Sequence, residues 1–260
     1  MTSSQVRSRG AAEVARRAAS KVPEVTVYFW IVKILTTGMG EAAADYVQSL
    51  VRPVLAVVLT GLLLLAGVAV QLRTRRYLAG VYWTAVVMVS VFGTIEADVL
   101  RHKLGLSNQV NTLIWLVALA AAFLAWYRTE RTLSIHSIHT RRREVFYWAT
   151  VMITFALGTA AGDWTAKSVG LGWLASALLF SAAMAVPAVL HRWAGLNAVL
   201  AFWTAYVLTR PVGASFADWM ADDRASGGLG WGKLMTTVVT SALIVAFVAF
   251  LAVTRRDVEE

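Results

Sequence analysis

The chain has 260 residues, of which 58% are hydrophobic and only 15% are charged. Soluble domains carry about 25% charged residues, so this composition excludes an ordinary soluble protein. The absence of cysteine excludes disulfides, thiolate metal sites and cysteine nucleophiles, and the distribution of the net charge of +9 fits membrane topology better than nucleic-acid binding.

Long apolar blocks follow one another along the chain. Nineteen residues, 53–71, pass without an ionisable side chain. A helix of that length crosses a hydrocarbon core of roughly 30 Å, and the alternation over about ten residues that is typical of membrane strands does not occur. We therefore predict an all-α polytopic membrane protein with eight transmembrane helices. The predicted spans are 24–47, 53–72, 78–99, 108–127, 145–166, 172–191, 196–219 and 232–253.

An even number of spans places both termini on the same side of the membrane, and the basic residues indicate which side. The tail 1–22, the loops on its side and the C-terminus hold sixteen Lys and Arg residues, whereas the opposite loops hold six. This excess predicts that both termini are cytoplasmic. The predicted segments are a basic cytosolic tail (1–22), two repeats (23–127), a cytosolic linker (128–144), two further repeats (145–254) and a second tail (255–260).

The repeats rest on one motif, Trp-x9-Gly-x4-Asp, which occurs four times without insertion or deletion. An aromatic residue precedes each tryptophan. The four copies are Trp30, Gly40 and Asp45; Trp83, Gly93 and Asp98; Trp148, Gly158 and Asp163; and Trp203, Gly213 and Asp218. Self-similarity at a fixed spacing is the signature of a repeat architecture.

Each repeat contains two spans, so all four motif helices must point the same way. The repeats are then parallel, related by pseudo-fourfold symmetry about an axis along the membrane normal. Each aspartate lies roughly 22 Å beyond its tryptophan and about 60° away around the helix. The aspartates should therefore form one layer in the outer third of the bilayer. The glycine between them permits close helix packing or a kink.

Two stretches of the chain resemble a known family. Lys21-Val-Pro-Glu-Val-Thr is followed by Tyr28-Phe-Trp30 and by Gly40-Glu-Ala-Ala-Ala-Asp45, and Thr209-Arg-Pro-Val-Gly-Ala-Ser-Phe-Ala-Asp218 lies in the last repeat. These segments resemble a bacterial family of uncharacterised membrane-anchored proteins built from a membrane repeat of unknown function. The resemblance implies the architecture and carries no activity. We expect a multi-pass protein of the bacterial inner membrane.

Ionisable residues within membrane spans are candidate functional groups, because each costs at least about 2.5–3.5 kcal/mol at a helix centre. Here the acids are Glu41, Asp45, Glu96, Asp98, Asp163 and Asp218, and the bases are Lys33 and Arg210. We expect Arg210 to pair with a carboxylate and Lys33 to extend toward the inner membrane face. The excess acid can be protonated, or can bind Mn²⁺, Mg²⁺ or Ca²⁺, for which carboxylate oxygens are suitable ligands.

Two functions remain open. The preferred hypothesis is a small-cation transporter or exporter, including of divalent metals, in which the four aspartates with Glu41 and Glu96 bind the ion or a proton. The alternative is a scaffold or signalling protein in which each aspartate clamps a neighbouring repeat through its backbone. The tryptophans are interpreted as interface anchors or packing residues rather than a cation–π ring. No enzyme motif is present, so we expect neither catalysis nor a resident cofactor.

Overall fold

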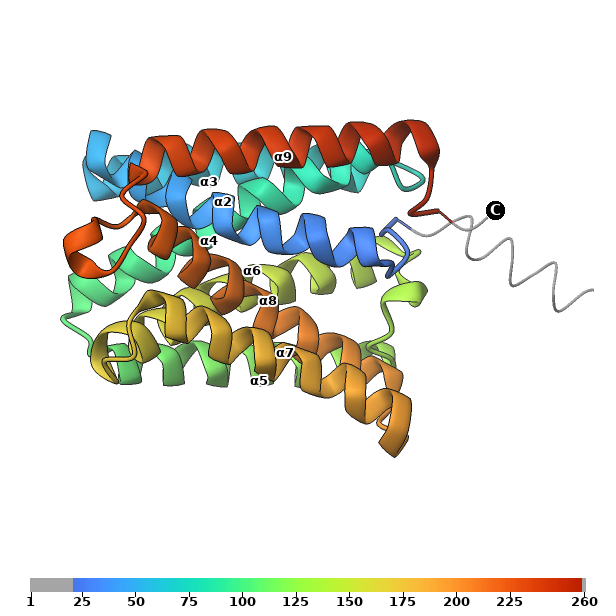
Figure 1. The fold of residues 1–260 in the computed structure, drawn as a ribbon. Helices are drawn as coiled ribbons and strands as arrows, with labels where there is room; N and C mark the ends of the chain where they lie inside the picture. Colours follow the sequence, from blue (N-terminus) through green and yellow to red (C-terminus); the bar gives the residue numbers. More distant parts are fainter. Residues whose placement is uncertain (1–20, 259–260) are drawn as a thin grey trace, which may run out of the picture.

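A computed structural model describes residues 21–258, so most of the predicted basic tail (1–22) lies outside the described residues. Within that range all regular structure is helical, and eight long helices run back and forth across the molecule (Figure 1). They are α2 (Val27–Leu50), α3 (Pro53–Arg73), α4 (Ala79–Leu104), α5 (Asn108–Glu130), α6 (Arg141–Asp163), α7 (Trp173–Ala194), α8 (Ala198–Ala221) and α9 (Gly232–Thr254).

The predicted spans and the observed helices agree to within a few residues at most ends. The linker is shorter than predicted, because α5 continues to Glu130 and α6 already begins at Arg141. Both Arg142 and Arg143 place their Nε atoms 2.7 Å from the Glu130 carboxylate, which joins these helix ends. Between them the chain forms only a short 3₁₀ turn, η1 (Ile135–Ser137).

Six of the eight helices are long and apolar enough to cross a membrane: α3, α4, α5, α6 with its extension to Ser168, α7 and α9. The other two, α2 and α8, have 24 residues each and are therefore equally long. They carry the fully buried charges Lys33 and Arg210, which lower their mean hydropathy. Both helices pack against several others of the bundle (Figure 1), and their buried Lys33 and Arg210 contact protein instead of lipid.

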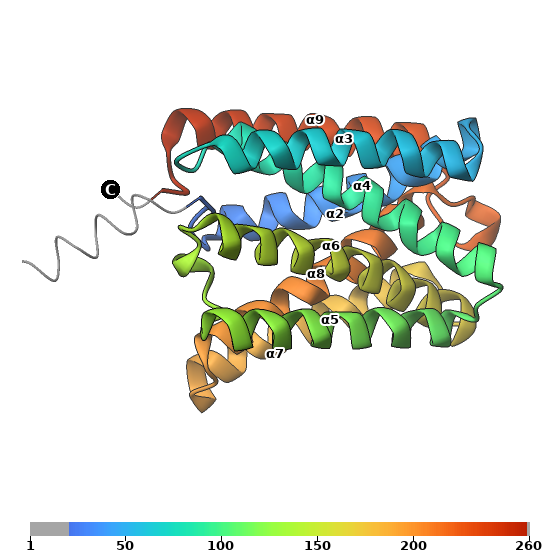
Figure 2. The same cartoon turned by 180° about the vertical axis from the view of Figure 1, so that it is seen from behind.

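The four motif helices form a closed inner ring, in which α2 packs on α4, α4 on α6, α6 on α8, and α8 again on α2. Each outer helix packs mainly on the motif helix of the next repeat: α3 on α4, α5 on α6, α7 on α8, and α9 on α2. Figure 2 shows α3 with α9 on one flank of the ring and α5 with α7 on the opposite flank. The fourth repeat therefore closes on the first.

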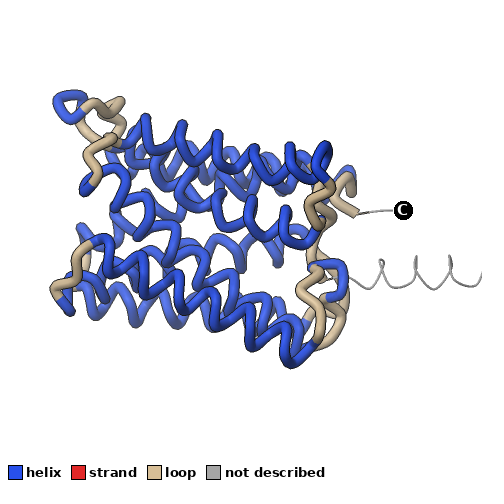
Figure 3. Tube along the Cα trace, turned by 90° about the horizontal axis from the view of Figure 1, so that it is seen from below, coloured by secondary structure: helices blue, strands red, loops and turns tan. Residues whose placement is uncertain are grey.

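The loops gather at two ends of the bundle (Figure 3). One end holds both described chain ends, where the Glu24 backbone N–H donates to the Asp257 carbonyl at 3.0 Å. We call this end the terminal side and the opposite end the aspartate side. At the terminal side the Tyr77 hydroxyl donates to the Asp257 carboxylate, whose pKa is raised by burial.

The aromatic residue before each motif tryptophan packs on the tryptophan of the next repeat. The ring centroids are 5.8 Å apart for Phe29 and Trp83, 5.7 Å for Tyr82 and Trp148, 6.2 Å for Tyr147 and Trp203, and 5.8 Å for Phe202 and Trp30. Such contacts add about 0.5–1.5 kcal/mol each beyond area burial. Three of the tryptophans are at most 5% exposed. These three are packing residues, which is one of the two roles predicted for them.

The motif glycines bring neighbouring motif helices into close contact. A Cβ atom on Gly93 would lie 2.9 Å from the Cβ of Phe155, and one on Gly158 would lie 2.5 Å from the Cβ of Arg210. The contacted residue always stands three positions before the glycine of the next repeat. The four pairs are Gly40 with Ser90, Gly93 with Phe155, Gly158 with Arg210, and Gly213 with Thr37. The glycines therefore serve close packing rather than kinks.

Replacing Gly213 with alanine should destabilise the ring, because the added Cβ would lie 2.7 Å from the Ile34 carbonyl oxygen and 2.8 Å from the Gly38 nitrogen. Backbone atoms cannot rotate away, so α2 and α8 must separate. We expect a loss of about 1–3 kcal/mol in the free energy of unfolding, measured by denaturation in detergent micelles.

The matched control is Gly80→Ala, since Gly80 is exposed in α4 and an added Cβ would meet nothing within 4 Å. This change should stabilise the protein by about 0.5–1 kcal/mol. Equal stability of the two variants would contradict the packing role of the motif glycine.

Candidate functional site

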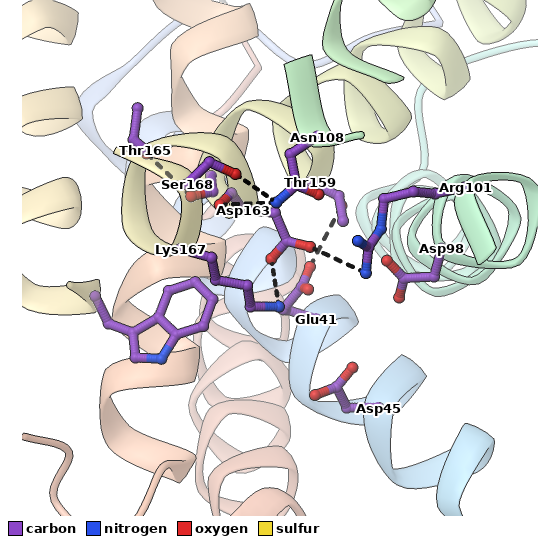
Figure 4. Close-up of polar contacts among 12 residues, drawn as sticks. Glu41, Asp45, Asp98, Arg101, Asn108, Thr159, Asp163, Thr165, Lys167 and Ser168 are labelled. Atoms are coloured by element: carbon purple, nitrogen blue, oxygen red, sulfur yellow. Dashed lines mark hydrogen bonds and ion pairs between the residues drawn. The ribbon is translucent and has the colours of Figure 1, made fainter. Parts of the chain in front are cut away.

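The four motif aspartates line one cavity at the aspartate side, with a volume of about 510 Å³. Asp45, Asp98, Asp163 and Asp218 come from α2, α4, α6 and α8, so each repeat contributes one carboxylate. Figure 4 shows Asp45, Asp98 and Asp163 around a common space, with Glu41 among them. Lys167 and Lys233 also line the cavity, and their side chains are about half exposed, which places its rim at the surface.

Three of the aspartates contact side chains of the preceding repeat around the ring. Gln48 donates to Asp98 at 3.1 Å, and the Arg101 guanidinium lies 4.0 Å from the Asp163 carboxylate. Gln48 and Arg101 each stand three residues after an aspartate, so they are equivalent positions of two repeats. Asp45 pairs with Lys233 of the fourth repeat at 3.0 Å. The predicted backbone partners are therefore wrong, because these carboxylates are held by side chains.

Asp218 differs from the other three. Its carboxylate lines the cavity but makes no hydrogen bond and no ion pair with any residue in the range 21–258. The positions equivalent to Gln48 and Arg101 in the last two repeats are Ala166 and Ala221, which have no donor to offer. Asp218 is therefore the carboxylate that stays free to bind something else.

Asp163 is positioned by a wide helical turn. Directly after it, the helix changes to a π-helix, η2 (Trp164–Ser168), in which the Val169 N–H donates to the Trp164 carbonyl at 2.9 Å. Lys167 lies one turn on and pairs with Asp163 at 2.8 Å. Asn108 donates to the Ser168 hydroxyl at 2.9 Å and fixes the turn against α5. Such π-turns are frequent at functional sites.

The inner end of the cavity is formed by a buried ion pair at the centre of the ring. The Glu41 carboxylate lies 2.5 Å from Nη2 of Arg210, whose side chain is fully buried, which confirms the predicted pairing of Arg210 with a carboxylate. The same nitrogen donates to the Thr159 hydroxyl at 2.8 Å and to the Thr94 hydroxyl. Nη1 donates to the Thr37 carbonyl at 2.8 Å. One guanidinium thus joins all four motif helices.

The residues around Arg210 occupy one repeat position. Glu41, Thr94 and Thr159 each follow directly after a motif glycine, and the fourth member is Ala214. The two threonines were not predicted from the sequence, because a hydroxyl in a membrane helix is common by itself. Their shared position directly after a motif glycine is the signal that could have identified them.

Lys33 lies deeper in the ring, on the terminal side of the ion pair. Its Nζ is fully buried, 3.9 Å from the centroid of the Phe155 ring and 4.3 Å from that of Tyr206. Within residues 21–258 this atom has no hydrogen-bond partner. The expectation that Lys33 extends to the membrane face is therefore wrong. The amino group lies against aromatic faces instead, whose quadrupoles attract it when it is protonated.

Glu96 does not line the cavity, although it was grouped with the aspartates as a candidate ligand. It precedes Asp98 by two residues, and residues at that spacing do not share a helix face. Among the described residues, no group of three His, Asp or Glu side chains lies close enough to hold a metal ion. What the cavity offers is a layer of carboxylates, three of them engaged and one free.

Replacing Arg210 with methionine should strongly destabilise the protein. The change would leave the Glu41 carboxylate buried without its counter-charge, which costs about 3–5 kcal/mol when one partner of a buried pair is removed. The melting temperature in detergent should fall accordingly. In the double variant Glu41→Leu, Arg210→Met no charge is stranded, so most of the loss should be recovered. A double variant no more stable than Arg210→Met would contradict this account.

Comparison with known proteins identifies the family of the chain. The model described as Repeat of Unknown Function (DUF347) matches the chain four times, at residues 28–77, 81–132, 146–196 and 201–257. Each match covers one motif helix and the outer helix that follows it. No curated protein and no solved structure matches the chain significantly. Because the four matches together span most of the sequence, the chain belongs to the family of proteins built from this repeat.

Proposed function

We propose that this protein transports a small cation across the membrane, with the aspartate-lined cavity as its vestibule and the Glu41–Arg210 pair as its closed gate. The observation that carries the proposal is that carboxylates from all four repeats meet in one cavity whose inner end is a buried ion pair. A scattered set of aspartates along lipid-facing surfaces would not favour transport.

The charges of the vestibule suit a cation that enters and leaves. Engaged carboxylates such as Asp45 and Asp163 are already balanced by Lys233, Lys167 and Arg101, so they retain little attraction for a second cation. Asp218 has no such partner, so its carboxylate oxygens are available to an incoming ion. We therefore assign Asp218 as the principal binding group, with Asp98 beside it, since Asp98 is held by a neutral amide only.

The ion pair would act as the gate because of its position and its sign. A cation moving inward from Asp218 meets the Arg210 guanidinium, which repels it while Nη1 and Nη2 are held by Thr37, Glu41 and Thr159. Passage then requires Glu41 to exchange Arg210 for the ion. Carboxylates that bind either a hard cation or a proton also suit exchange of Mn²⁺, Mg²⁺ or Ca²⁺ for protons.

The alternative function, a membrane scaffold clamped by its aspartates, is favoured by a different observation. Asp45, Asp98 and Asp163 each contact a side chain of the preceding repeat. In a scaffold these contacts would be the whole purpose of the carboxylates. The two proposals differ over Asp218, which takes no part in the clamp and is central to transport.

We expect Asp218→Asn to lower ion flux by at least about tenfold, because the amide keeps the shape but cannot ionise to bind a cation or release a proton. The assay is uptake into proteoliposomes with Mn²⁺, Mg²⁺, Ca²⁺ or a proton gradient, monitored by dyes inside the vesicle. The matched control is Glu96→Gln, which removes an acid of the same helix layer that does not line the cavity. Unchanged flux in Asp218→Asn, or no flux of any of these ions in the wild type, would overturn the proposal.

Stability measurements separate the clamp from transport. Asp163→Asn should lower the melting temperature in detergent, because it weakens the contacts with Arg101 and Lys167. Each such partly exposed pair contributes at most about 1 kcal/mol. Asp218→Asn should leave stability unchanged or raise it, since no bond is lost and repulsion with the other carboxylates is relieved. A loss for Asp218→Asn as large as that for Asp163→Asn would favour the scaffold.

A further inference from the structure

A second hollow lies at the terminal side of the bundle, far along the helices from the aspartates. This apolar groove runs between α2, α7, α8 and the linker and has a volume of about 740 Å³. Its walls include Met184 and Ala188 of α7, Phe202 and Ala205 of α8, and Trp30 of α2. Volumes of about 300–1,000 Å³ with mostly apolar walls are typical of ligand sites between helices of a bundle.

The repeat symmetry explains why the groove exists. In the second repeat, Phe123 and Trp126 of α5 pack on Trp203, with ring centroids 5.1 and 5.6 Å apart. The positions equivalent to Phe123 and Trp126, counted from the helix N-caps Ser107 and Gly172, are Ala188 and His191 in α7. Both line the groove together with Trp30.

The same substitution leaves Trp30 unlike the other motif tryptophans. Trp83, Trp148 and Trp203 are buried, whereas Trp30 is only partly buried and forms part of the groove wall. The third repeat thus lacks the two aromatic side chains that occupy the equivalent place in the second repeat. Packed protein interiors rarely leave such a space empty.

The polar groups of the groove are concentrated at its terminal end. Ser134 and His136 belong to the linker, and His191 belongs to the last turn of α7. The one polar residue further in, Ser181, donates its hydroxyl to the Ala177 carbonyl at 2.7 Å and needs no partner. An occupant therefore has an apolar body and a polar end that reaches the level of the helix ends.

The groove communicates with the lipid-facing surface of α7. Val186, Val189 and Leu190, on the same helical turns as Ala188, are between 42 and 49% exposed. α7 is one of the helices apolar enough to cross a membrane, so these side chains face hydrocarbon. An occupant can thus enter sideways from the bilayer without crossing water.

The charge around the polar end indicates the kind of head group. Arg192 follows His191 in the last turn of α7, and the terminal ends of the other outer helices also carry arginines, among them Arg73, Arg128 and Arg255. Glu24 is the acid at the groove mouth, and it lies 3.4 Å from Nε2 of His136. Clusters of arginine beside membrane helices attract anionic lipids.

We infer that the groove binds an anionic phospholipid, with one acyl chain between α7 and α8 against Trp30 and the phosphate beside His191 and Arg192. The site does not depend on whether the protein transports ions. The bound lipid would fill the space that the side chains of Phe123 and Trp126 fill in the second repeat.

The test restores those two side chains. In Ala188→Phe, His191→Trp the groove should be filled, and the variant should lose the phospholipid that the wild type retains. The measurement is native mass spectrometry of the full chain after exchange from vesicles of phosphatidylglycerol or of phosphatidylcholine. We expect one tightly retained phosphatidylglycerol per wild-type chain and at least a fivefold lower occupancy in the variant. Val189→Phe adds an aromatic ring beside the groove and should leave occupancy unchanged.

If the double variant does not fold, Ala188→Leu serves in its place and should lower occupancy at least twofold. Retention of lipid by the filled variants equal to that of the wild type would overturn the inference. Equal retention of phosphatidylcholine would overturn the assignment of an anionic head group. A wild-type dimer that the filled variant abolishes would show that a second copy, and not a lipid, occupies the groove.

Discussion

The structure depends on close contact between the motif helices of successive repeats. Every position of Trp-x9-Gly-x4-Asp acts on a neighbouring repeat. The aromatic residue at the start packs on the next tryptophan, the glycine receives a side chain of the next repeat, and three of the four aspartates contact the previous repeat. A repeat alone cannot satisfy any of these contacts. The ring closes only when the fourth repeat packs on the first, and Gly213 makes this contact by packing against Thr37. The unbroken spacing of the motif follows, because one inserted residue would turn these groups about 100° away from their partners.

The chemistry of the molecule lies where the symmetry is broken. A ring of four equal helices brings four equivalent side chains close to one axis, and four like charges there would repel one another strongly. The position after the glycine is accordingly charged once, at Glu41, while Thr94 and Thr159 supply neutral hydroxyls. The matching cation, Arg210, also occurs in one repeat only. The residues repeated in all four units form the ring of helices. Glu41 and Arg210, which each occur in one repeat only, supply the charged groups on its axis.

The architecture could be predicted from the sequence, because the architecture depends on periodic features of the sequence. Apolar length fixed the eight helices, and the motif spacing fixed four parallel units with their aspartates at one level. The partners of those aspartates could not be predicted in the same way. Gln48 and Lys233 reach Asp98 and Asp45 from other repeats, and contacts across repeats depend on helix rotation and on which outer helix packs where. Lys33 illustrates the limit: hydropathy allowed it to extend toward water, whereas the ring encloses it between Phe155 and Tyr206.

Under the proposed function, the aspartate layer serves both stability and ion binding, because its members differ in their partners. Asp45 is balanced by Lys233 and Asp163 by Arg101 with Lys167, whereas Asp98 accepts a hydrogen bond from the neutral Gln48. These contacts join neighbouring repeats at the mouth of the ring. A fourth engaged aspartate would leave a rigid, neutral rim with nothing to attract a ligand. Four free ones would repel one another and weaken the ring. Ala166, the residue of the third repeat at the position of Gln48 and Arg101, offers no side-chain donor to Asp218, which lines the cavity unpaired. The arrangement is what a binding site on a repeat scaffold requires: most copies of the motif maintain the frame, and one copy is released from that role.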